Sequence, residues 1–164
     1  MPLEPSRRLL RQTLSDIYAG PAWHGASLLS TVRSISAAEA RRRPAPRRNT
    51  IWELVLHLAY TRHRVLGRIG AGPGGRFPRR LVKAWWPAMP AAPGPRAWRA
   101  DLALLAEYQA RLLDAVRRIP AARLRRRRAV QPRSIGHELL NVAVHDAYHT
   151  GQIRLLLRLG GRRA

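Results

Sequence analysis

The sequence predicts an all-α protein with the architecture of an antiparallel four-helix bundle, in one domain that spans residues 1–164. Two observations predict this fold class. Apolar residues recur at helical spacing in four blocks, and no alternating β-branched runs bounded by two-residue turns indicate strands. A hydrophobic content of 46% is enough for a core, and 164 residues fit a single domain.

The first block covers about residues 6–35. Gly20 and Pro21 interrupt it, because proline lacks the backbone N–H that a helix interior needs. A turn follows from Ser36 to Glu39, with the spacing of a capping box in which each side chain bonds the other residue's backbone N–H. The sequence therefore predicts a broken first helix and then a capped turn.

The second block begins at Thr50, which forms a second capping box with Glu53, and ends at Gly70. Its apolar residues fall on one side of a helix at 100° per residue. They are Ile51, Leu54, Val55, Leu58, Val65, Leu66 and Ile69.

Residues 71–95 form a long connection rich in glycine and proline. Connections of this length are uncommon unless they are structured or functional. The adjacent Trp85 and Trp86 indicate that it folds back and packs, and we expect it to be a crossover between the second and third helices of the bundle.

The third block covers residues 96–119, with Pro95 at a favourable first-turn position and Pro120 as a stop. The fourth covers residues 134–159, with Ser134 as the expected N-cap. These two blocks complete the four predicted helices.

The net charge of +22, from 31 basic and 9 acidic residues, has two interpretations. One is a polyanionic partner, either nucleic acid or an anionic membrane surface. The other is a compositional bias toward arginine, which accounts for every basic residue except Lys83. The arginines are spread along the chain from Arg7 to Arg163, which favours compositional bias, and we expect only weak, non-specific contact with nucleic acid.

The absence of cysteine excludes disulfides, cysteine nucleophiles and thiolate metal sites, and it fits a reducing compartment. We find neither a signal peptide nor a run of about 18 apolar residues. We therefore expect a cytoplasmic protein without a membrane partner.

His145 and His149 are four residues apart on the fourth predicted helix, so their side chains project about 40° from each other and can reach one divalent metal. Glu138 and Gln152 share that face, where they could orient the imidazole N–H groups. The alternative is a pair of hydrogen-bonded core histidines. Asp146 points about 100° away, so it is a poor candidate for a general base.

A third ligand must come from another helix. His57 lies at the edge of the apolar stripe of the second helix. His63 lies about 120° from His57 around the same helix, so both cannot serve one site without distortion. His57 is therefore the better candidate, and we expect His63 and His137 to be ordinary surface or boundary residues.

Three ordered motifs resemble the DinB-like superfamily, and together they extend over nearly the whole chain. They are Trp-His-Gly-Ala-Ser-Leu at residues 23–28, Thr-Ile-Trp-Glu-Leu-Val-Leu-His at 50–57, and His-Asp-Ala-Tyr-His-Thr-Gly-Gln-Ile at 145–153. The resemblance implies a four-helix bundle, often a homodimer, with zinc or nickel held by three histidines. By position these are His57, His145 and His149.

The resemblance also implies a small metalloenzyme that acts on a small-molecule substrate. Its members include transferases and an isomerase that use a low-molecular-weight thiol, and hydrolysis is a close variant. Two alternatives remain: a non-enzymatic, stress-related metal-binding protein, or a basic nucleic-acid-associated protein.

His24 is the one candidate catalytic residue outside the ligand set. It could line the pocket or carry a proton, or it could merely tie the first helix to the last. We expect Tyr148, Trp85 and Trp86 to serve packing.

Overall fold

The computed structural model of the chain describes residues 4–72, 75–128 and 131–161. It is mostly helical, as the sequence predicts. The four long helices are α1 (Pro5–Tyr18), α4 (Ile51–Arg68), α5 (Pro95–Arg118) and α7 (Ile135–Leu159), and the three short ones are α2 (Leu28–Val32), α3 (Ala37–Arg41) and α6 (Ala121–Arg125). Within the described residues, none of the helices has the length and hydropathy needed to cross a bilayer.

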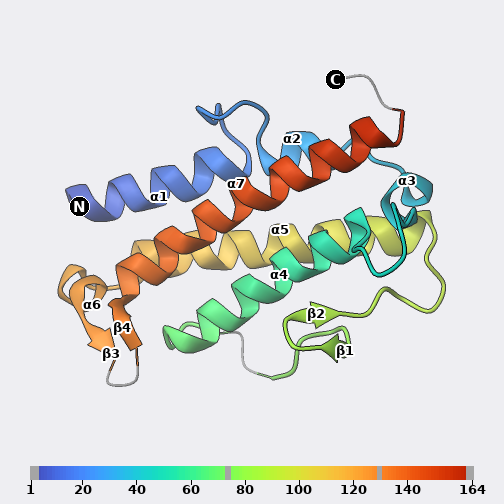
Figure 1. Ribbon diagram of the computed structural model, residues 1–164. Helices are drawn as coiled ribbons and strands as arrows, with labels where there is room; N and C mark the ends of the chain where they lie inside the picture. The colour runs from blue at the N-terminus through green and yellow to red at the C-terminus, as the bar shows by residue number, and fades with distance from the viewer. Residues whose placement is uncertain (1–3, 73–74, 129–130, 162–164) are drawn as a thin grey trace.

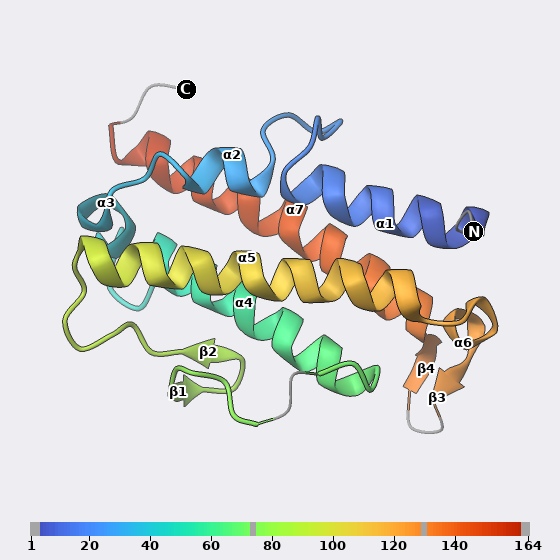
Figure 2. The same ribbon diagram turned by 180° about the vertical axis from the view of Figure 1, so that it is seen from behind.

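The four long helices pack in a ring in which α1 and α4 each contact both α5 and α7. Helices α1 and α7 run in one direction and α4 and α5 in the other (Figure 1 and, from behind, Figure 2). The apolar stripes meet at the centre of the ring, where Leu14, Val55, Leu112 and Leu139 are buried. Since α4 and α5 share a direction, the chain between them has to return along the ring.

The predicted helix boundaries are confirmed at several caps. Ser36 and Thr50 both close capping boxes, at the starts of α3 and α4. Pro95 occupies the first turn of α5, and the hydroxyl of Ser134 accepts a hydrogen bond from the backbone N–H of His137 at the start of α7. Local sequence thus sets where these helices begin.

The connections also contain short strands, for which the sequence carries no signal. Two short antiparallel pairs form: β1 (Leu81–Lys83) with β2 (Trp86–Pro87), and β3 (Arg127–Arg128) with β4 (Gln131–Ser134). These strands have two to four residues, too few to show an alternating pattern. Strand β2 packs against α4, so tertiary contacts stabilise a hairpin that has no signal of its own.

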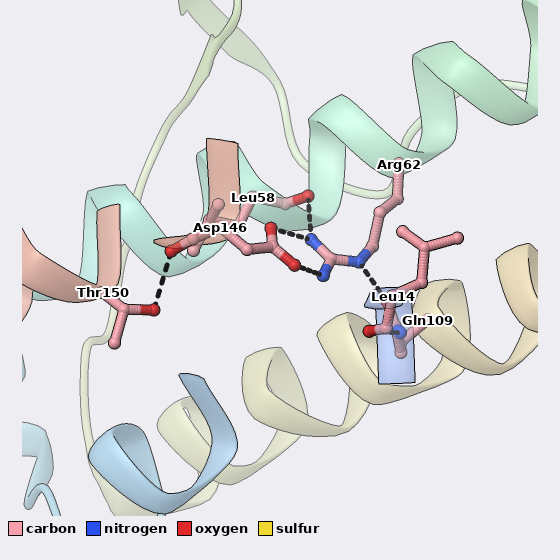
Figure 3. A network of polar contacts seen from close by, with 6 residues as sticks. All are labelled: Leu14, Leu58, Arg62, Gln109, Asp146 and Thr150. Atoms are coloured by element: carbon pink, nitrogen blue, oxygen red, sulfur yellow. Dashed lines mark hydrogen bonds and ion pairs between the residues drawn. The ribbon is translucent and has the colours of Figure 1, made fainter. Parts of the chain in front are cut away.

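A buried polar network joins the four long helices (Figure 3). The guanidinium of Arg62 on α4 is fully buried and donates to both carboxylate oxygens of Asp146 on α7. It also donates to the carbonyl of Leu58, at 3.1 Å, and to Oε1 of Gln109 on α5, at 2.9 Å. Nε2 of Gln109 then donates to the carbonyl of Leu14 on α1, at 3.0 Å. The network therefore fixes α4 against α7, with α5 and α1 tied to both.

Candidate metal centre

The three histidines predicted as metal ligands lie together. His57 comes from the middle of α4, and His145 and His149 come from successive turns of α7, which packs against α4. One ring nitrogen from each residue lies within 4.8 Å of the others. The structure thus brings together residues that are separated by 88 positions in the sequence.

The Nε2 atoms of all three rings face one point. Nε2 of His145 lies 3.0 Å from Nε2 of His57 and 3.0 Å from Nε2 of His149. Nδ1 of His57 faces the carbonyl of Trp85 at 2.7 Å, and Nδ1 of His149 faces Oε1 of Gln152 at 2.7 Å. Both Nδ1 atoms therefore carry the ring proton, which leaves lone pairs on the Nε2 atoms of His57 and His149.

This arrangement cannot be satisfied by the rings alone. His145 can offer at most one hydrogen at Nε2, so at least one of the two lone pairs stays without a donor. A divalent cation fits instead, since three nitrogens at zinc distance in a tetrahedral site lie about 3.3 Å apart. Three nitrogen ligands would leave coordination positions open to a substrate.

The protonation states of the three rings also suit a cation. Burial lowers the pKa of His57, and it lowers the pKa of His149 despite the hydrogen bond from that ring to Gln152. Burial, together with the neighbouring His149 and His57, lowers the pKa of His145 to about 3. All three rings are therefore neutral at pH 7, which is the form that binds metals.

Trp85 and Trp86 support His57 directly, a role that was not predicted from the sequence. The ring of Trp86 stacks on the imidazole of His57 with centroids 4.3 Å apart. Trp85 has a positive φ of 68°, which is unusual for a bulky residue, and its carbonyl accepts the Nδ1 proton of His57. The length of the connection and its paired tryptophans were the signal that it packs, but nothing local indicated which helix it would reach.

Gln152 and Tyr148 form a short relay behind His149. The amide Nε2 of Gln152 donates to the hydroxyl of Tyr148 at 2.9 Å, which fixes the amide so that its oxygen faces His149. The ring of Tyr148 packs edge-on against His149 with centroids 5.0 Å apart, as expected, although 63% of the residue is exposed. Its polar end matters here, since it sets the orientation of an amide that could otherwise flip.

A pocket of about 490 Å³ opens beside the histidines, between α4 and α7. His57 and His145 line one end, and Arg68 and Glu138 lie farther along the two helices. Glu138 is buried and forms an ion pair with Nε of Arg68 at 3.4 Å, and it makes no hydrogen bond to an imidazole among the described residues. The pocket gives a small molecule access to the candidate metal centre.

The remaining histidines lie outside this cluster. His24 is exposed in the segment between α1 and α2, and it does not line the pocket. His63 hydrogen-bonds the hydroxyl of Tyr108, and His137 is exposed on α7. Asp146 faces away from the cluster into the network with Arg62, as its helical position indicated.

The comparisons with known proteins agree with this picture. The family model described as the DinB superfamily matches residues 22–153, a span that contains all three histidines, the helices from α2 to α6 and most of α7, whereas α1 lies outside it. No curated protein and no solved structure was found to match the chain. Because the match covers most of the sequence, the chain belongs to the DinB superfamily.

Proposed function

We propose that the protein binds a divalent metal ion, zinc or nickel, through His57, His145 and His149. In this proposal it is a small metalloenzyme of the thiol-dependent transferase or metal-dependent hydrolase type, acting on a small molecule. The observation that carries the proposal is the convergence of three Nε2 atoms, 3.0 Å apart in two of the three pairs, where at least one lone pair has no donor among the described residues.

The side chains around the histidines have separate tasks. Trp85 and Gln152 accept the Nδ1 protons of His57 and His149 and so hold those rings with Nε2 inward. Trp86 shields one face of His57 from water. When bound, the metal ion would supply Lewis acidity, which lowers the pKa of a thiol or of water.

Metal analysis of the untagged protein tests the ligand assignment. We expect about one divalent ion per chain in the wild type and background levels in His57→Ala, His145→Ala and His149→Ala, since each variant removes a third of the donor set. His137→Ala, on the exposed side of α7, is the matched control and should keep its metal. Stoichiometric metal in all three ligand variants would refute the assignment.

We also propose that the ring of helices is an antiparallel four-helix bundle, with a crossover between α4 and α5, and that residues 1–164 form this single domain. We further propose that two copies of the chain pair through α7. Exposed apolar residues follow one another along that helix: Leu140, Val144, Leu155 and Leu159. Residues 134–153, which include Leu140 and Val144, contain no arginine, so two positively charged copies can meet at this part of α7 without direct repulsion.

Sedimentation of the wild type should give twice the chain mass of 18.5 kDa. The substitution Val144→Arg should give the single-chain mass, because it places like charges at the centre of the interface. Leu9→Arg, at an exposed apolar position on α1, should leave the dimer intact. A wild-type monomer at tens of micromolar would contradict the proposed pairing.

A further inference from the structure

The pocket beside the histidines gathers polar atoms that have no hydrogen bond. In the described part of the chain, eight buried side-chain nitrogen and oxygen atoms lack such a partner. Five of them belong to residues that line this one pocket: Oγ1 of Thr61, Nε of Arg68, both carboxylate oxygens of Glu138, and Nδ1 of His145. Buried polar groups are normally paired, so this concentration indicates a place where a ligand supplies the partners.

The pocket is long enough to separate two parts of a ligand. Glu138 precedes His145 by seven residues on α7, which corresponds to about 10 Å along the helix. Along α4, the distance from His57 to Arg68 is larger still than the distance from His145 to Glu138 along α7. A ligand whose one end reaches the histidines therefore places its other end between Arg68 and Glu138.

Glu138 is an acceptor without a hydrogen-bond donor at this far end. Its side chain is only 5% exposed, and its ion pair with Nε of Arg68, at 3.4 Å, lacks the geometry of a hydrogen bond. A buried carboxylate with two unbonded oxygens is costly unless a donor approaches it. A ligand ammonium group would supply the hydrogens that the ion pair with Arg68 does not provide.

Arg133 supplies the opposite charge. It belongs to β4, lines the same pocket, and has no hydrogen bond or ion pair to any other residue in the described ranges. Its guanidinium presents several donors in the planar arrangement that matches a carboxylate. The far end thus combines an acceptor for a cation with a donor for an anion.

We propose that this far end binds the α-amino-acid group of a small molecule, with the ammonium on Glu138 and the carboxylate on Arg133. The inference rests on the proposed function only for what occupies the opposite end, where the three histidines lie. It names a substrate class: zwitterionic compounds whose reactive group is about 10 Å from the amino-acid group.

The test uses three matched probes and the full-length protein loaded with cobalt. The probes are γ-glutamylcysteine, its analogue without the α-amino group (glutarylcysteine), and its analogue without the α-carboxylate (4-aminobutanoylcysteine). Calorimetry measures binding, and the cobalt absorption spectrum reports whether the thiol reaches the histidine end. We expect γ-glutamylcysteine to bind at least about tenfold more tightly than either analogue.

Two variants separate the two contacts. Glu138→Gln should remove the preference over glutarylcysteine while keeping the preference over 4-aminobutanoylcysteine, and Arg133→Gln should do the reverse. Arg158→Gln, an exposed arginine on α7, is the control for loss of one positive charge and should behave as wild type. Circular dichroism shows whether each variant is folded, and either variant alone suffices for the test.

The two proposals fail in different ways. Equal affinity for the three probes in the wild type, or discrimination unchanged in both variants, would overturn the amino-acid subsite even if the cobalt spectrum responds. Failure to bind cobalt would overturn the proposed metal centre, and the probe preferences can still be measured by calorimetry on the metal-free protein. A preference that persists there supports the subsite on its own.

Discussion

Two polar clusters join α4 to α7, and they differ in whether their own residues satisfy them. Asp146 and His145 are neighbours in the sequence, yet their side chains enter different clusters. The carboxylate of Asp146 is bonded by the buried Arg62, whose remaining donors reach Leu58 and Gln109. His145 instead meets His57 and His149, with Nε2 atoms face to face and its Nδ1 unbonded.

The difference separates a structural cluster from a binding one. Each of the three guanidinium nitrogens of Arg62 finds an acceptor within the described residues, so this pairing needs no ligand. Around the histidines, lone pairs converge on a point where the protein provides too few hydrogens. Burial alone does not distinguish the two clusters, since His57 and His149 are nearly as buried as Asp146. What distinguishes them is whether the polar groups satisfy one another.

The largest change in the free energy of unfolding should come from breaking the ion pair between Arg62 and Asp146. Asp146→Leu or Arg62→Met alone leaves one buried charge without its partner, and we expect a loss of about 3–5 kcal/mol in the free energy of unfolding. The double variant Arg62→Met with Asp146→Leu should lose less than either single variant, because no unpaired charge remains. Urea denaturation in the presence of a chelator measures all three. Additive losses in the double variant would show that the pair is not coupled.

At the cluster of three histidines, the free energy of unfolding should depend on whether metal is bound. Adding zinc to chelator-treated wild type, to 100 times its dissociation constant, should raise the free energy of unfolding by about 2.7 kcal/mol. His149→Ala should show no such rise, since its donor set is incomplete. Thermal unfolding with and without zinc measures the difference, and His137→Ala is the control that should respond as wild type does. A rise of equal size in His149→Ala would mean that zinc acts elsewhere.

A smaller effect should come from the residue that orients His149. Gln152→Ala removes the acceptor at Nδ1, and we expect metal affinity to fall about 10- to 100-fold. Gln152→Glu keeps an acceptor oxygen in the same place and should hold affinity near the wild-type value. Competition against a chromophoric chelator measures both variants. If alanine and glutamate have the same effect, the hydrogen bond does not orient the ring.

Much of the fold and of the candidate site could be predicted because the signals are local. The spacing of His145 and His149 on one helix, and the position of His57 beside an apolar stripe, selected the three residues that the structure brings together. The capping boxes at Ser36 and Thr50 are likewise contained within four residues. Short-range patterns of this kind depend on helical geometry alone.

The supporting residues could not be predicted in the same way. The carbonyl of Trp85 reaches His57 across 28 residues, and no pattern specifies which backbone oxygen a returning loop will present. The strands β1 and β2 have too few residues to show a period. Tyr148 is expected to pack because it points away from the two ligands, and no local pattern indicates that its hydroxyl also accepts a hydrogen bond from Gln152.

The sequence by itself determined the four long helices and the faces on which the histidines lie, because these follow from residue spacing and backbone geometry. Only the tertiary structure decided which polar groups end up satisfied. That depends on distances between atoms on different helices. Arg62 donates a hydrogen bond to Asp146, whereas Arg68 lies 3.4 Å from Glu138 without one. The candidate metal centre and its pocket are recognised by the groups that remain without partners, and this property exists only after the helices have packed.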